Sequence, residues 1–479
     1  MAFTEQQEAK LTQLLSAFEN GKRLQDLPEV SGTNPFNLIT EVLDEDGESK
    51  KAPLASLLPY LESECAYGVE LDTSVSATTL TRILNSDLHR SLPIQNRMRG
   101  CLLDDDGNVV EYLPPESWIG ATRDGSRGQV MVEIPSHYRK FETEGNKRRA
   151  KISEYPLPGY HYVPKSYVSA YQASLQRTGN KLSSVANGSA DFRGGNNTSA
   201  WDNTYRSLLG KPVTNISRSA FRTYARNRKS GSTKWNCMTY DIQKTLFWLF
   251  VIEYANTNSQ AAYNPQKDAN GFAQGGLGDG VSTWDWTSWG NFNNYNPFVP
   301  CGHTDSLGNK SGVVAYELHN EAGDTLKTFS VPRYRGVENP FAHIWQWTDG
   351  INVRISPTIE NGGDGLSKVF VCHDPAKFND SNYDGYSHVG NEARNEGYVR
   401  TLIFGEGGEI IPDAVGGGST TFIPDYHYTN IPTTEALRGV LFGGNAYSGA
   451  YCGFACASSN DTPSDTSARI GSRLCFLPE

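Results

Sequence analysis

The sequence predicts an α+β protein in which two helices precede a long region of short strands and loops. Three observations support this class. Of 479 residues, 47 are glycine and 24 are tyrosine, and only 20% are charged, a composition typical of loop-rich globular domains. Apolar residues at helical spacing follow Ser217 and Thr239, and each of these two residues can cap a helix. Segments with alternating side chains, such as Gln129–Ile134, are typical of strands.

The N-terminal region has its own helical pattern. Residues 4–20 fit one amphipathic helix that begins with a capping box at Thr4. An isolated helix of this length is marginal in water, so we expect its apolar stripe to pack on the rest of the chain or on other copies. Residues 26–51 are polar and turn-rich, as in a linker. Pro53 is expected to start a second short helix that ends at Leu61.

Strands are expected after this point. Residues 69–75 alternate in the manner of a strand, as Gln129–Ile134 do. Asp104–Gly107 has the composition of a hairpin turn. Trp345 and Trp347 alternate with a polar residue in an otherwise apolar context, which predicts a strand covered on both faces.

We therefore divide the chain into three parts. Residues 1–66 form a helical region for attachment or oligomerisation, residues 67–128 a β-rich connecting region, and residues 129–479 the main domain. A chain of this length can bury a large core without metals or disulfides.

Charge and hydropathy exclude several classes of protein. The formal net charge is −10, which argues against a nucleic-acid-binding face. The longest apolar run, Leu246–Ile252, is too short to span a bilayer. Residues 1–8 are acidic, whereas a secretion signal starts with basic residues. We expect a soluble chain made in a reducing cytoplasm without its own export signal, and without membrane insertion.

Motifs for catalysis are absent from the sequence. It contains no GxSxG, HExxH or Walker loop. Cys452 and Cys456 lie four residues apart; they are either packed free thiols or a redox pair, and the second role needs a thiolate of lowered pKa. We expect no catalytic residue.

One segment resembles half of a calcium loop. Asp380, Asn382 and Asp384 alternate and are followed by Gly385, as at the start of an EF-hand loop. Asn391 stands where that loop places a bidentate glutamate. The alternative is an Asx-turn loop without metal, and apart from this calcium candidate we expect no cofactor.

Several segments, in this order along the chain, resemble the formylglycine-generating enzyme family and its C-type-lectin-like fold. They are Pro212–Ser217, Glu253–Ala255, Ala342–Asp349, Arg438–Gly444, Thr462–Pro463 and Ala468–Cys475. The resemblance implies a C-type-lectin-like domain with two helices. That family uses two reactive cysteines a few residues apart; here Cys452 falls near one position, and the other falls near Ala446 and Tyr447, where there is no sulfur. The resemblance therefore does not carry the oxidase activity.

A second resemblance covers nearly the whole chain. Its segments are similar to tail-fibre and receptor-binding proteins of gut Bacteroides phages or prophages: Leu88–Pro93, Gln129–Tyr138, Ile152–Gly159, Tyr167–Tyr171, Leu246–Gln260 and Asp413–Thr420. This resemblance implies a virion tail protein, a homotrimer, that contacts other tail proteins and a bacterial surface receptor, either glycan or protein. In related lectin-like proteins, diversity-generating retroelements vary the C-terminal segment.

Residues 444–468 have the composition of such a variable binding segment. Tyrosine supplies contact area at low entropic cost, and serine and asparagine adapt their hydrogen bonds. The predicted contact residues are Asn445, Tyr447, Ser448, Tyr451, Phe454, Ser458, Asn460, Asp461, Ser464 and Asp465. The alternative for this segment is an ordinary Gly/Ser-rich surface loop.

The leading hypothesis is a non-enzymatic phage receptor-binding protein. A formylglycine-generating-type oxidase and a purely structural virion protein are the alternatives.

Overall fold

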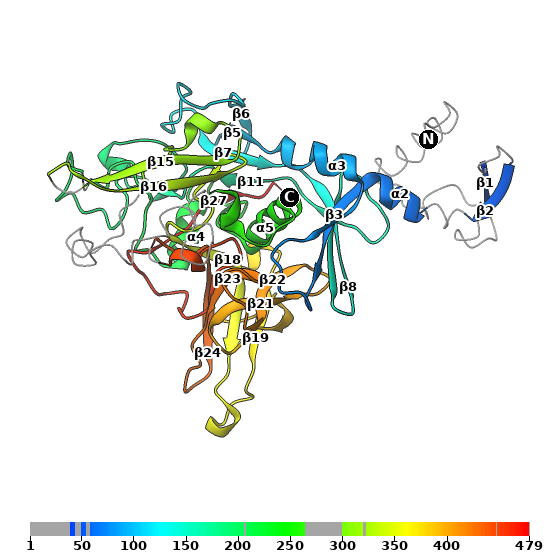
Figure 1. Cartoon of the computed structure of the whole chain (residues 1–479). Coiled ribbons are helices and arrows are strands. Elements are labelled where there is room, and N and C mark those ends of the chain that lie inside the picture. The colour runs from blue at the N-terminus through cyan, green and yellow to red at the C-terminus, as the bar shows by residue number, and fades with distance from the viewer. Residues whose placement is uncertain are drawn as a thin grey trace.

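Three large β-sheets surround one central helix (Figure 1). The structure, a computed structural model, describes residues 39–43, 49–53, 58–205, 207–263, 299–319, 322–446 and 448–478. These residues form many strands and few helices, so the predicted α+β class is confirmed at this level. The α-helices within them are α2 (Leu58–Cys65), α3 (Ser86–Ser91), α4 (Arg218–Arg226) and α5 (Tyr240–Tyr254).

The five-stranded sheet has the order β10-β8-β9-β3-β4. Its strands are β3 (Ala66–Asp72), β4 (Thr81–Leu84), β8 (His137–Glu144), β9 (Lys147–Ser153) and β10 (His161–Val163). The six-stranded sheet has the order β14-β27-β11-β7-β5-β6. Its strands are β5 (Arg99–Leu103), β6 (Val109–Tyr112), β7 (Gln129–Ile134), β11 (Ser166–Ser169), β14 (Trp235–Cys237) and β27 (Leu474–Phe476).

The nine-stranded sheet has the order β20-β19-β18-β24-β25-β23-β21-β22, with β26 paired to β18. Its strands are β18 (Trp345–Ile355), β19 (Ser367–Val371), β20 (Ser387–Asn391), β21 (Gly397–Phe404), β22 (Glu409–Val415), β23 (Ile423–Tyr428), β24 (Ala436–Phe442), β25 (Ala457–Ser458) and β26 (Ile470–Gly471). The remaining strands are β1 (Ile39–Leu43), β2 (Ser49–Pro53), β12 (Ser174–Gln176), β13 (Lys181–Ser183), β15 (Gly312–His319), β16 (Thr325–Tyr334) and β17 (Val337–Glu338).

The two predicted central helices form where their caps place them. The Ser217 hydroxyl accepts a hydrogen bond from the Ala220 N–H, and the Thr239 hydroxyl accepts one from the Ile242 N–H. Helix α5 is buried along nearly its whole length, because sheets lie on both sides of it (Figure 1). Strand β18 is buried at every position except Arg354. The prediction that Trp345 and Trp347 lie on a strand covered on both faces is therefore confirmed.

Several predicted boundaries near the N-terminus are wrong. Pro53 ends β2 and pairs with Ile39, so it does not start a helix; β1 and β2 pair in and just after the expected linker, and the described helix α2 runs from Leu58 to Cys65. The strand expected over 69–75 ends at Asp72, because the Asp72 carboxylate accepts hydrogen bonds from the backbone and hydroxyl of Ser74 and closes a turn. The amphipathic helix expected over 4–20 lies outside the described residues.

The hairpin predicted at Asp104–Gly107 is confirmed, since β5 and β6 are antiparallel on either side of it. The predicted boundary at residue 129 does not separate two units. Strand β5 pairs with β7 and strand β3 pairs with β9, so both sheets cross that boundary. One hydrophobic core also runs from Tyr67 to Cys475.

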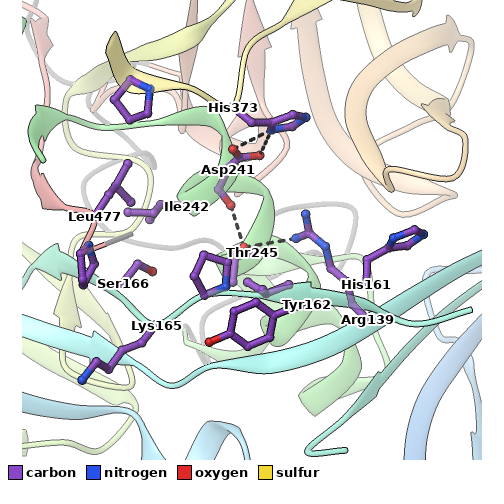
Figure 2. A pocket seen from close by; sticks show the side chains of 14 residues that line it. Arg139, His161, Tyr162, Lys165, Ser166, Asp241, Ile242, Thr245, His373 and Leu477 are labelled. Carbon is purple, nitrogen blue, oxygen red and sulfur yellow. Dashed lines mark hydrogen bonds and ion pairs between the residues drawn. The ribbon is translucent and has the colours of Figure 1, made fainter. Parts of the chain in front are cut away.

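Parts of the three sheets meet beside the first turns of α5. A cavity of about 390 Å³ opens there. It is bordered by β8 and β10 of the five-stranded sheet, the start of β11 in the six-stranded sheet, and the turn after β19 of the nine-stranded sheet (Figure 2).

Candidate functional site

The C-terminal segment, residues 444–468, is fixed at both ends to one buried strand. Strand β24 leads into the segment and β26 follows it, and both pair with β18. Gln346 of β18 pairs with Phe442 before the segment and with Gly471 after it. The Gln346 side chain also accepts a hydrogen bond from Arg473 Nε at 2.8 Å. The segment is therefore a loop on a rigid base, and strand β25 within it pairs with β23 and β24.

A groove of about 340 Å³ opens along this loop. Trp345 and Tyr428 contribute aromatic rings that meet edge to face, with their centroids 5.8 Å apart. Five of the predicted contact residues line the groove together: Asn445, Ser448, Ser458, Asn460 and Asp461. We call this site the C-terminal groove; its other lining residues are Leu441, Ser467, Arg469 and Ile470. Its aromatic wall and convergent polar groups are what a small-ligand site requires.

The groove carries charge as well as hydrogen-bonding groups. Burial raises the pKa of Asp461, and the nearby carboxylate of Asp465 raises it further. Arg469 is exposed on the same groove. A ligand can therefore meet a carboxylate, a guanidinium, hydroxyls and amides within one site.

A cluster of tyrosines adjoins the groove. Tyr451 lies 4.4 Å from Tyr426 and 5.2 Å from Tyr398 between ring centroids, and Tyr426 lies 4.7 Å from Tyr428. We call Tyr398, Tyr426, Tyr428 and Tyr451 the tyrosine cluster. Tyr428 belongs to both the cluster and the groove. The cluster is open to solvent, since Tyr451 is 39% exposed and the other three rings are partly exposed.

The sequence interpretation missed Tyr398, Tyr426 and Tyr428, which lie on β21 and β23 outside the C-terminal segment. A signal for two of them was available. Tyr426 and Tyr428 alternate along one strand, and alternate residues share a face.

The predicted contact residues differ in exposure. Ser464 and Asp465 are exposed like Tyr451, and Ser448, Asn460 and Asp461 are partly exposed. Tyr447 lies outside the described residues. The expectation of an outward-facing side chain is wrong for three residues, Asn445, Phe454 and Ser458, which are 2%, 1% and 5% exposed. Asn445 and Ser458 still line the groove.

Phe454 is buried because the segment turns inward at Cys452–Ala457. Its ring packs against Phe250, Phe341 and Tyr334. The run of small and apolar residues around Phe454 predicts such burial. The prediction of an outward-facing side chain relied instead on the Tyr/Ser/Asn-rich composition of the whole segment.

Two buried carboxylates outside the segment accept hydrogen bonds from it. Asp425 accepts a hydrogen bond from the Ala455 N–H at 2.8 Å, and Glu392 accepts hydrogen bonds from the hydroxyls of Ser459 (2.7 Å) and Thr429 (3.1 Å). Burial raises the pKa of each carboxyl to about 7. A Cβ at Gly453 would lie 2.0 Å from the Asp425 carboxylate, so glycine is needed there. These contacts fix the backbone of the segment.

Cys452 and Cys456 are buried free thiols. Burial raises the pKa of both, whereas a reactive cysteine needs a lowered pKa. The Cys452 thiol donates to the backbone carbonyl of Asn445 at 3.4 Å. This environment is typical of packed thiols.

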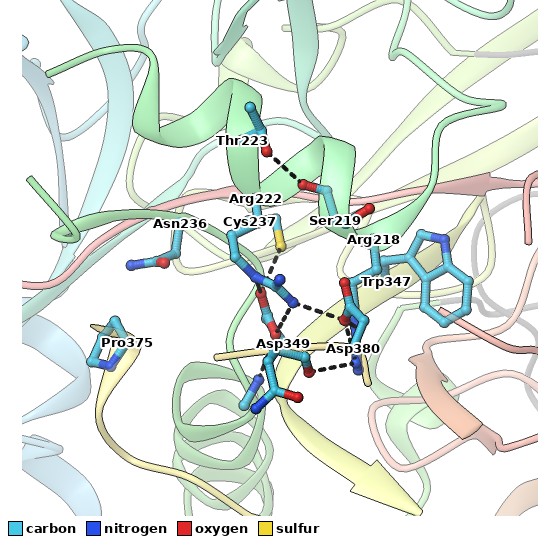
Figure 3. Close-up of polar contacts among 12 residues, drawn as sticks. Arg218, Ser219, Arg222, Thr223, Asn236, Cys237, Trp347, Asp349, Pro375 and Asp380 are labelled. Atoms are coloured by element: carbon cyan, nitrogen blue, oxygen red, sulfur yellow. Dashed lines mark hydrogen bonds and ion pairs between the residues drawn. The ribbon is translucent and has the colours of Figure 1, made fainter. Parts of the chain in front are cut away.

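In the candidate calcium loop, the Asp380 carboxylate forms ion pairs with arginine side chains (Figure 3). Asp380 accepts hydrogen bonds from Arg218 Nε at 2.7 Å and from Arg222 Nη2 at 2.8 Å. Two guanidinium groups thus neutralise the carboxylate that would be the first calcium ligand. The Asn382 side chain accepts a hydrogen bond from the Asp384 N–H, which makes an Asx turn. Within the part of the chain that the structure describes, no group of three or more His, Cys, Asp or Glu side chains can hold a metal ion.

In comparisons with known proteins, no family model and no curated protein matches this chain. Among the described helices, none has the length and apolar character needed to cross a membrane.

Proposed function

We propose that this protein is a receptor-binding protein of a bacteriophage tail fibre, and that it binds a bacterial surface ligand through the C-terminal groove and the tyrosine cluster. One observation carries the proposal. Five of the contact residues predicted from the composition of the C-terminal segment line a single groove, and this groove shares Tyr428 with the partly exposed tyrosine cluster. Tyrosine, serine and asparagine on a rigid base are the residues of adaptable recognition surfaces.

The chemistry of the groove favours a surface glycan. A sugar ring has an apolar face that can lie on the partly exposed ring of Tyr428, which packs on the buried Trp345, and its hydroxyls can exchange hydrogen bonds with Ser448, Asn460 and Asp461. A protein loop on the bacterial surface is the other class of receptor.

The proposal includes a finer assignment of the fold. The loop between β24 and β26 would be the variable region of a C-type-lectin-like domain of the formylglycine-generating-enzyme type. Its ends pair with β18 and its backbone is held by Asp425 and Glu392. Side chains at exposed positions could then be diversified by a retroelement without loss of the core.

The remaining parts of the proposal follow from the tail-fibre role. One groove per chain gives modest affinity, and a homotrimer raises avidity by presenting three grooves together. The chain would contact other virion tail proteins and neither nucleic acid nor the interior of a membrane. We propose no catalytic role for it: the thiols of Cys452 and Cys456 are buried with raised pKa, which disfavours the alternative of a thiol-dependent oxidase. No cofactor is part of the proposal.

The test is adsorption of the labelled protein to a panel of Bacteroides strains. We expect saturable binding to at least one strain, and Tyr451→Ala should weaken it about 10- to 30-fold, as loss of an interfacial aromatic anchor does. Tyr205→Ala is the matched control, because Tyr205 is 54% exposed and lies outside the groove and the cluster. This variant should bind as the wild type does.

Two results would contradict the proposal. One is equal binding by the Tyr451→Ala variant and the wild type. The other is the absence of binding to every strain that the virion itself infects.

A further inference from the structure

The cavity beside α5 is separate from the C-terminal groove. Its walls carry Arg139 from β8, Tyr162 from β10, Lys165 before β11, Asp241 and Thr245 from α5, and His373 after β19. Figure 2 shows Arg139 reaching toward Thr245 and the Asp241–His373 pair, with the Tyr162 ring below them. No residue of this cavity lines the C-terminal groove.

Arg139 has unused hydrogen-bonding capacity. In the described part of the chain its guanidinium donates a single hydrogen bond, to the Thr245 hydroxyl at 3.3 Å, and it has no ion pair within 4.0 Å. A guanidinium has five N–H donors in a planar fork. Burial lowers the pKa of Arg139, although Asp241 and Glu409 act in the opposite direction. The side chain is thus partly desolvated without a matching anion.

The carboxylate of Asp241, which lines the cavity, is already paired. Both Asp241 oxygens lie within hydrogen-bond distance of His373 Nδ1, at 2.8 and 3.0 Å. The hydrogen bond and charge of Asp241 raise the pKa of His373. Behind this pair, Lys244 is bound to Glu409 at 3.0 Å. Glu409 is thus paired with Lys244, and Asp241 with the His373 ring. Apart from histidine, the charged side chains that line the cavity are Arg139, Lys165 and Asp241, so cations exceed carboxylates there by one, in a chain whose net charge is −10.

Lys165 adds a second cation at the rim. It is exposed, and its ammonium lies 5.8 Å from the ring centroid of Tyr167. The rest of the cavity wall is largely apolar. The ring of Tyr162, which is 49% exposed, lies there together with Pro164, Ile242 and Leu477. The cavity thus combines an apolar, partly aromatic wall with the planar guanidinium of Arg139.

We propose that this cavity binds a small organic carboxylate with a ring-shaped body, such as a hexuronic acid. The carboxylate would pair with Arg139 through two parallel hydrogen bonds, a geometry that guanidinium groups favour. The ring would lie against Tyr162 and Pro164. A carboxylate suits the site better than a phosphate dianion, because Arg139 and Lys165 against Asp241 leave one excess positive charge in the lining, which a monoanion balances.

Calorimetric titration of the full-length protein with glucuronate tests the assignment. Glucose serves as the neutral analogue and inorganic phosphate as the competing anion. We expect saturable binding of glucuronate at millimolar concentration, no binding of glucose, and weaker binding of phosphate. Arg139→Gln should weaken glucuronate binding about 10- to 100-fold, as loss of a charged hydrogen-bond pair does.

Arg148→Gln is the matched control. Arg148 lies on the same sheet but donates to backbone carbonyls at the β8–β9 turn, so this variant should bind glucuronate like the wild type. Tyr162→Ala provides a second test at an exposed position, and it should weaken glucuronate binding several-fold without loss of the fold, because the sugar ring loses its aromatic contact.

Three results would overturn the inference: no binding of glucuronate by the wild type, equal binding of glucuronate by the Arg139→Gln variant, or tighter binding of phosphate than of glucuronate. Because Arg139 and Tyr451 belong to different sites, adsorption of the Arg139→Gln variant to bacteria distinguishes this inference from the proposed function.

Discussion

Phe454 is the side chain through which the C-terminal segment enters the hydrophobic core, and its replacement by alanine tests that arrangement. The ring is 1% exposed. It lies 5.1 Å from Phe250, 5.5 Å from Phe341 and 5.8 Å from Tyr334 between centroids. The backbone is fixed too, since Gln243 of α5 donates to the Phe454 carbonyl at 2.7 Å. Because other rings and a fixed backbone surround the Phe454 ring, its removal should leave a cavity that the neighbouring side chains cannot fill.

The expected loss of unfolding free energy for Phe454→Ala is about 3–5 kcal/mol, which combines the lost apolar burial with the cost of the cavity. Urea unfolding followed by tryptophan fluorescence measures it. Phe454→Leu keeps most of the volume and should lose about 1.5 kcal/mol or less. Tyr451→Ala, at the exposed end of the same segment, should lose under about 1 kcal/mol. A loss below about 1 kcal/mol for Phe454→Ala would refute the inward turn of the segment.

Two further predictions concern buried charges. Because the folded pKa values of Asp425 and Glu392 are raised to about 7, against about 4 when unfolded, their contribution to stability is complete below about pH 4 and is lost as the pH rises to about 7. Unfolding free energies of the wild type should therefore fall relative to the E392Q/D425N variant across this range by about 1.4 kcal/mol per pH unit and carboxyl; a constant difference would contradict this. Arg222→Met leaves Asp349, which is fully buried at 0% exposure, without its guanidinium partner. The variant should lose about 3–5 kcal/mol of unfolding free energy, measured by urea unfolding. Lys229→Met, at an exposed ion pair, should change the unfolding free energy little, and equal losses in the two variants would contradict the prediction.

The elements that the sequence predicted correctly carry local signals. Ser217 and Thr239 cap helices because a side-chain oxygen reaches an N–H within the first turn. Asp104–Gly107 makes a hairpin because its two strands are neighbours in the chain. The pairings that were missed are distant: β5 with β7, and β11 with β27 at the other end of the chain. Such pairings depend on how whole faces pack, which no local pattern specifies.

For the candidate site, the sequence predicted which residues take part better than it predicted whether their side chains face the solvent or the core. The sequence identified residues that line the groove, such as Asn460 and Asp461. It placed Phe454 outside, since an aromatic side chain in a Gly/Ser-rich segment can bind a ligand or fill a core equally well. It missed Tyr398 and Tyr426, which come close to Tyr451 because β21 pairs with β23 and β23 pairs with β25 of the segment.

The most direct test of the central claim is oxidative footprinting of tyrosines on the protein, alone and with the surface polysaccharide of a strain to which it adsorbs. The account predicts that the polysaccharide protects Tyr451 and Tyr398 and leaves Tyr205 as reactive as before. Unchanged reactivity at Tyr451 and Tyr398, with binding saturated, would contradict the claim that this surface recognises the host.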